Sequence, residues 1–237
     1  MVKWNPYRAG YLPLKTLLVK RLESSFYAFT QSLFRFQQAI DNMLSMFEDN
    51  RIFIAPDLDI NKLLEEGLSC DEIEAKINEK GGNNKEYKKE DFDVKFVDLL
   101  KQDKKKIDAL IKRWEKVNID PKLIEFAKQI QQEFFKPSKN ISGKLIIFTE
   151  SKETAEVLSL KLSDITDKKV ITVNSENRKQ LENIIRENFD ANLEEEKWKS
   201  DYDIIITTEV LAEGINLHRS NVIVNYDVPW NSTRLMQ

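Results

Sequence analysis

The chain of 237 residues contains a single cysteine, Cys70, and a single histidine, His218. Because a disulfide needs two cysteines, none can form within the chain, and such low cysteine usage is typical of a reducing compartment. One cysteine and one histidine are too few ligands for a Cys/His zinc site, and they disfavour a Ser-His catalytic triad. We therefore expect neither a metal site nor a disulfide framework.

Long apolar segments are also lacking. No run approaches the roughly 20 residues that cross a membrane, and the N-terminal MVKWNPYRAG lacks the apolar centre of a signal peptide. The composition predicts a soluble, cytoplasmic protein without a membrane partner. A net charge of −3 gives no overall basic field, so binding of nucleic acid would need a local basic patch or a partner domain.

Glycine is scarce, with six in the whole chain, and neither G-x-x-x-x-G-K-[ST] nor G-x-G-x-x-G occurs. Without a glycine-rich loop, the chain cannot cradle a nucleotide triphosphate in the P-loop manner by itself. A free-standing kinase, or a dehydrogenase of the Rossmann kind, is therefore disfavoured.

Apolar residues recur at helical spacing through residues 14–47, which predicts a helix about 50 Å long if it is continuous. A second helical pattern covers residues 96–117. Between them we expect two short helices, the second capped by Ser69, and then a loop around residues 81–84. Asp120 as N-cap and Pro121 at the first helical position predict a further helix that ends near Phe135. The first part of the chain is thus predicted to be all-helical.

The period changes after KPSKNISG. Short apolar runs, KLIIFTE, KKVITVN, YDIIITTE and NVIVNYD, alternate with segments of helical spacing. This alternation predicts an α/β domain with a parallel sheet and right-handed crossovers. We expect a helical subdomain over residues 1–136, with a small helical insertion at about 51–90, and an α/β domain over residues 141–237.

Parallel sheets bind ligands beyond the carboxyl ends of their strands. Hydroxyl and amide side chains dominate that edge here, and they suit phosphate oxygens because they add donors without bulk. The alternative is that they only cap the helices that follow. The residues are Thr149, Glu150 and Ser151, then Asn174 and Ser175, then Thr207, Thr208 and Glu209, and finally Asp227.

Several segments of the chain match known motifs. IIITTEVLAEGINL resembles motif V of superfamily 2 helicases, and KLIIFTESKETAEVL looks like their motif IV strand and helix. VIVNYDVPWNSTRLMQ is similar to the approach to motif VI in the bacterial Swi/Snf-related branch, and LLVKRLESSFYAFTQSLFRF resembles the segment that joins the two motor lobes there. Motifs in the correct order and spacing carry more weight than any one of them.

This resemblance implies the second RecA-like lobe of an ATP-dependent nucleic-acid helicase or translocase, a P-loop NTPase-like lobe without its own P-loop. The full-length protein would then use ATP and Mg²⁺, and its partners would be nucleic acid, DNA rather than RNA, and an N-terminal RecA-like lobe. The implied ATP-binding residues are Glu213, Gly214, Asn216 and Gln237. The implied nucleic-acid contacts are Thr149, Lys152, Asn174, Ser175, Arg178, Thr207 and Thr208.

The sequence departs from the family pattern in three respects. Asn174-Ser175 replaces the glycine after the second strand, and Arg178 and Arg186 flank the usual place of an arginine in the next helix. The Gly-Arg-x-x-Arg that should follow Gln237, the first residue of motif VI, is absent, as is the first lobe. We therefore expect a fragment that is inactive by itself. The alternative is a non-catalytic protein-interaction module on a RecA-like scaffold.

Overall fold

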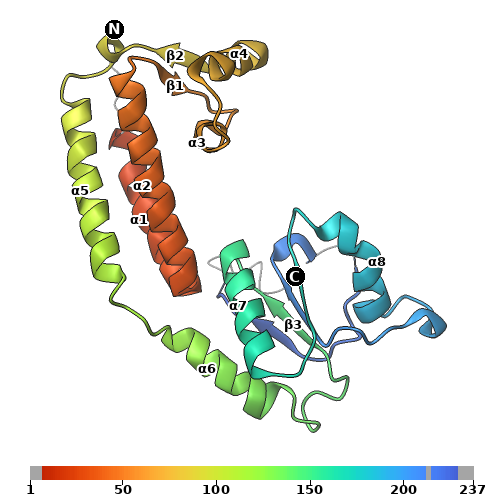
Figure 1. Cartoon of the computed structure of the whole chain (residues 1–237). Helices are drawn as coiled ribbons and strands as arrows, with labels where there is room; N and C mark the ends of the chain where they lie inside the picture. Colours follow the sequence, from red (N-terminus) through yellow and green to blue (C-terminus); the bar gives the residue numbers. More distant parts are fainter. Residues whose placement is uncertain (1–6, 212–214, 229–237) are drawn as a thin grey trace. The chain divides into compact units, whose positions relative to one another are not determined.

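The computed structural model describes residues 7–211 and 215–228 (Figure 1). The chain divides into two compact units, which are described separately. The first comprises Met1–Thr16 and Thr30–Val117, and the second comprises Leu17–Phe29 and Asn118–Gln237.

Long helices form the frame of the first unit. Helix α2 covers Phe26–Glu48 and α5 covers Phe96–Trp114. Helix α1 covers Tyr7–Ser24, and its part from Leu17 onward belongs to the second unit. The indole N–H of Trp114 in α5 donates to Thr30 Oγ1 at 2.9 Å, and Lys104 Nζ donates to Asp41 at 2.5 Å. Trp114, at the end of α5, thus contacts Thr30 near the start of α2, and Lys104, earlier in α5, contacts Asp41 later in α2. Helices α2 and α5 therefore run antiparallel.

The segment between these helices contains the small elements α3 (Ile60–Glu65), α4 (Cys70–Lys80) and η1 (Lys89–Asp91). The predicted cap of the second short helix is confirmed, because Ser69 and Glu72 form a reciprocal capping box. The prediction of an all-helical first part is wrong in one respect. Strand β1 (Ile52–Ile54) pairs antiparallel with β2 (Lys85–Tyr87). Three residues per strand are too few for an alternating pattern to be read from sequence.

The second unit holds a four-stranded sheet, flanked by α6 (Pro121–Gln129), the π-helical turn η2 (Ile130–Phe134), α7 (Lys152–Ile165) and α8 (Arg178–Phe189). Its strands are β3 (Leu145–Phe148), β4 (Val170–Val173), β5 (Ile204–Thr207) and β6 (Ile223–Asn225). They lie in the order β4-β5-β3-β6, and all pairs are parallel. Two short 3-10 turns, η3 (Glu195–Lys197) and η4 (Glu209–Leu211), flank β5 in the chain.

Successive residues of the strands point to opposite faces, so each face has its own core. Ile147 and Ile206 pack with Leu158 of α7 and Phe126 of α6. On the other face, Ile146, Ile205 and Val173 pack with Ile185 and Phe189 of α8. The prediction of an α/β fold with a RecA-like parallel sheet, preceded by a helical region, is confirmed.

Two features differ from the divisions expected from sequence. The helical pattern of residues 14–47 is not one helix, because α1 ends at Ser24 and α2 begins at Phe26. The segment Leu17–Phe29 and helix α6, which the sequence pattern assigns to the helical subdomain, lie in the unit of the parallel sheet. The second unit is therefore built from two separate stretches of chain. Among the described residues, none of the helices has the length and apolar character needed to span a bilayer.

Candidate functional site

The carboxyl ends of the four strands meet at one edge of the sheet. The register places Val173, Thr207, Phe148 and Asn225 in one row. Each strand therefore ends at the same level, and the polar residues that follow are neighbours along this edge. This is the arrangement that the sequence predicts for the ends of parallel strands.

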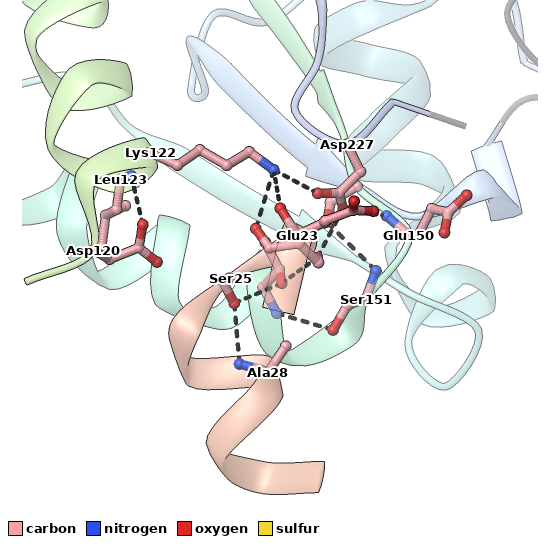
Figure 2. A network of polar contacts seen from close by, with 12 residues as sticks. Glu23, Ser25, Ala28, Asp120, Lys122, Leu123, Glu150, Ser151 and Asp227 are labelled. Carbon is pink, nitrogen blue, oxygen red and sulfur yellow. Dashed lines mark hydrogen bonds and ion pairs between the residues drawn. The ribbon is translucent and has the colours of Figure 1, made fainter. Parts of the chain in front are cut away.

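Asp227, two residues beyond β6, is the centre of a buried hydrogen-bond network at this edge (Figure 2). Its Oδ2 accepts from Thr149 Oγ1 at 2.5 Å, from the Glu150 amide at 2.8 Å and from Ser24 Oγ at 2.9 Å. Its Oδ1 accepts from Lys122 Nζ at 2.9 Å. The Asp227 side chain is only 7% exposed, so these four donors replace the water that a charged carboxylate requires.

Lys122 of α6 ties this carboxylate to the end of α1. Its ammonium also donates to the carbonyl oxygens of Glu23 and Ser24, and it lies 4.0 Å from the centre of the Tyr226 ring. The last carbonyl groups of a helix lack partners within the helix and carry partial negative charge, so a lysine there satisfies and stabilises them. Burial raises the pKa of the Tyr226 phenol, and nearby Asp120 and Asp227 add to this effect.

Ser24 and Ser25 join the break between α1 and α2 to the start of α7. The Thr154 hydroxyl lies 2.7 Å from Ser24 Oγ and 2.8 Å from Ser25 Oγ. Ser25 Oγ in turn accepts from the Ala28 amide at 3.0 Å and so caps α2. Thr154 is fully buried. The serine pair therefore explains both why the long helix is interrupted and where the interruption is anchored.

Arg21 provides a second link to α7. Its guanidinium donates to Ser151 Oγ at 3.0 Å and to Glu153 at 3.1 Å. Ser151 is the N-cap of α7 and accepts from the Thr154 amide. The alternative for these hydroxyls, that they cap the following helix, is thus realised at Ser151.

Three of the predicted nucleic-acid residues are buried in the framework of the edge. Thr149 is 4% exposed, Thr207 is fully buried and Asn174 is 9% exposed. Thr207 Oγ1 donates to the Thr208 carbonyl, and Asn174 Oδ1 accepts from the amides of Glu176 and Asn177. Their polar atoms are occupied by the protein itself.

The other four predicted residues are accessible to solvent. Lys152 and Ser175 are exposed, and Arg178 and Thr208 are half-buried. Lys152 lies at the first position of α7 and pairs with Glu176 at 2.6 Å, and this hydrogen bond raises the pKa of the lysine. This group spans the ends of β4 and β5 and the start of α7.

Of the predicted ATP-binding residues, Glu213, Gly214 and Gln237 lie outside the described residues. Asn216 is described and half-buried. Its Nδ2 donates to Asn192 at 3.1 Å and its Oδ1 accepts from the His218 amide. The side chain is therefore held at the loop that follows β5.

Sequence reasoning placed Thr149 and Asp227 among the polar residues at the strand ends, but it did not select Ser24, Arg21 or Lys122. Asp227 carries a visible signal, because it is an acidic residue directly after an apolar strand. Ser24, Arg21 and Lys122 carry none, since they lie on helical patterns more than a hundred residues before Asp227 in the chain. A cleft of about 540 Å³ opens beside the network, lined by Lys20, Glu23, Ser24, Lys122, Glu150, Tyr226, Asp227 and Val228.

Residues 123–237 match the helicase conserved C-terminal domain family. This part of the chain is similar to helicase C-terminal domains. The match covers the whole parallel sheet with α7 and α8, whereas Leu17–Phe29 and Lys122 lie outside it.

Two relatives align with part of the chain. One is the ATP-dependent RNA helicase ROK1 of Meyerozyma guilliermondii, 36% identical over 119 residues, which are 48% of this chain and 19% of that protein. The other is the probable ATP-dependent RNA helicase DDX59 of Homo sapiens, 31% identical over 97 residues, which are 41% of this chain and 14% of that protein. The chain thus spans less than a fifth of each relative's length.

Among solved structures, the Pyrococcus furiosus Hef helicase domain aligns with 93% of this chain and 36% of its own, at 14% identity and a TM-score of 0.37.

Proposed function

We propose that this chain is part of an ATP-dependent RNA helicase or translocase, in which residues 123–237 act as the second motor lobe. The observation that carries the proposal is the helicase C-terminal domain match over the parallel sheet. Both relatives are named as RNA helicases. We therefore propose RNA as the nucleic-acid partner, in place of the DNA that was expected from the sequence. The Swi/Snf-related assignment rests on the quoted motifs alone, and we make the proposal at the level of superfamily 2.

Within this function, we assign the RNA backbone contacts to Lys152, Ser175, Arg178 and Thr208. Phosphate contacts need accessible donors, and these four side chains are exposed or half-buried. The buried Thr149, Thr207 and Asn174, by contrast, hold the edge in shape. The proposed footprint therefore lies at the ends of β4 and β5 and the start of α7.

ATP and Mg²⁺ belong to the proposal for the whole helicase, where hydrolysis of ATP supplies the free energy for movement along the strand. The amide of Asn216 fits a polar contact to a nucleotide, because it is half-buried and its present partners are a neutral side chain and a backbone amide. The sequence contains no P-loop, so we expect the 237 residues alone not to hydrolyse ATP. RNA-stimulated release of phosphate by the purified chain would contradict this expectation.

The test is fluorescence anisotropy with a labelled single-stranded RNA of mixed sequence, over a series of salt concentrations. Lys152→Ala should weaken binding and reduce the slope of log affinity against log salt by about 0.7, since one phosphate contact is lost. Lys128→Ala is the matched control, because Lys128 is also an exposed lysine paired with a glutamate at a helix surface. Thr208→Ala should weaken binding without a comparable change in slope.

Equal effects of Lys152→Ala and Lys128→Ala would refute the footprint. Absence of RNA binding by the unaltered chain at low salt would refute the proposed function and favour the protein-interaction module. A parallel titration with single-stranded DNA of the same sequence tests the choice of RNA, which requires the tighter binding to be to RNA.

A further inference from the structure

We propose that the segment Leu17–Phe29 is a functional part of the helicase lobe. In this proposal, Ser24 and Arg21 position the β3–α7 loop for contact with RNA. The part of this inference that concerns RNA rests on the proposed function. It assigns a role to residues that lie outside the helicase C-terminal domain match.

The first step concerns the loop itself. Residues Thr149, Glu150 and Ser151 connect β3 to α7, and Lys152 follows at once. The loop is held at its start by Asp227, which accepts from the Thr149 hydroxyl and from the Glu150 amide. The position of Lys152 therefore depends on two anchors, the strand end at Asp227 and the N-cap at Ser151.

The second step is that both anchors receive hydrogen bonds from the segment Leu17–Phe29. Ser24 Oγ donates to the same Asp227 oxygen that holds the loop, at 2.9 Å, and Arg21 Nη1 donates to the N-cap hydroxyl of Ser151 at 3.0 Å. Ser24 and Ser151 are 5% and 2% exposed. The Ser24–Asp227 bond is therefore shielded from water, whereas the Arg21–Ser151 bond is part-buried, since the Arg21 side chain is 29% exposed.

The third step concerns charge. Asp227 is a buried carboxylate, and a buried charge requires its full set of partners. Two of its four donors, Ser24 and Lys122, come from residues before the family match. Without these two, the carboxylate would retain only the loop's own hydroxyl and amide. The loop would then be able to follow the carboxylate toward water, and its geometry would loosen.

Through these bonds the segment Leu17–Phe29 positions the β3–α7 loop, which a helix that only packed on the surface of the unit would not do. Ser24 and Arg21 are positioning residues, since they act on Lys152 through the loop and not by direct contact with RNA. The prediction is local: removal of these bonds loosens the β3–α7 loop before it unfolds the lobe.

The experiment compares Ser24→Ala with Ser220→Ala in the full chain. Ser220 is the matched control, because it is a buried serine in the same unit whose hydroxyl bonds to the carbonyls of Lys144 and Val222 at the opposite end of the sheet. Amide hydrogen exchange, measured by NMR under native conditions, reports opening at Glu150 and Ser151. Anisotropy with single-stranded RNA reports affinity.

For Ser24→Ala we expect exchange at the Glu150 amide to rise about tenfold, as the loss of one buried bond to a charged group predicts, and RNA affinity to fall at least about threefold. Ser220→Ala should leave both unchanged. Arg21→Met provides a second variant, which should raise exchange at the amino end of α7 and also weaken binding.

Unchanged exchange at Glu150 in Ser24→Ala would overturn the inference, as would raised exchange with unaltered RNA affinity. If the unaltered chain does not bind RNA, the proposed function fails and the exchange result alone decides whether the segment positions the loop. If Ser24→Ala does not fold, Arg21→Met decides by the same two measurements.

Discussion

Replacement of Asp227 by asparagine should selectively destabilise the unit that contains the parallel sheet. Asparagine preserves the shape of the side chain but has one oxygen and one NH₂ group. If its oxygen faces Ser24, Thr149 and the Glu150 amide, its NH₂ group faces the Lys122 ammonium, and two donors oppose each other. If the amide turns over, three donors lose their acceptor. Neither orientation satisfies the network.

The size of the expected loss in stability follows from the burial of the Asp227 and Lys122 side chains. Removal of one partner of a buried ion pair costs about 3–5 kcal/mol. The Asp227 side chain is 7% exposed, but that of Lys122 is 36% exposed and can recover part of its hydration. We therefore expect the free energy of unfolding of this unit to fall by about 2–3 kcal/mol. This loss corresponds to roughly a 30- to 150-fold rise in the equilibrium constant for opening of the unit.

Because a chain of two units need not unfold in one step, the measurement should be amide exchange in β3 and β5, whose residues are buried except for the half-buried Phe148. Asp203→Asn is the control, since Asp203 accepts a single bond from the Lys169 amide, which asparagine can also accept. The control should lose less than about 1 kcal/mol. A loss below about 0.5 kcal/mol in Asp227→Asn would mean that the four contacts are not formed together, and would refute the reasoning.

Three smaller effects follow from local contacts. Ser69→Ala removes the N-cap of α4 and should cost about 1 kcal/mol, measured as faster exchange confined to that helix. Asp120→Ala should cost about 1–2 kcal/mol, because it caps α6 and also accepts from an amide at the start of α2; no change in α6 exchange would contradict this. Hydrogen bonds from Lys136 and Lys139 lower the pKa of Glu133 to about 2 from 4.5. Its stabilising effect is thus present above the unfolded pKa of 4.5 and is lost as the pH falls toward 2. An NMR titration of the carboxyl checks the value, and Lys136→Gln should move it upward.

The elements that sequence reasoning located correctly are those whose signals are local. The apolar runs of the four strands are bounded by turn residues, and each was recognisable without knowledge of its neighbours. The caps at Ser69 and Asp120 depend on residues within one turn of helix. The short pair of β1 and β2 escaped detection because its strands are separated by thirty residues and stabilise one another only on pairing.

The same distinction applies to the candidate site. The strand ends were identified as polar, and the register brings them to one edge. Which of them face solvent was not readable, since Thr207 and Thr208 are identical neighbours in the sequence, yet the first is fully buried and the second half-buried. Thr149 is buried because Asp227, 78 residues later in the chain, takes up its hydroxyl.

By itself, the sequence determined the α/β alternation, the lack of a P-loop and the order of the helicase-like motifs, because these depend on composition and on spacing within short windows. Only the tertiary structure decided that Ser24, Lys122 and Asp227 form one buried network, and that the unit of the parallel sheet includes Leu17–Phe29, a segment that lies in the chain between the two stretches of the helical unit. The physical reason is that a buried charge must find its donors wherever the folded chain brings them, and those donors leave no periodic trace in the sequence.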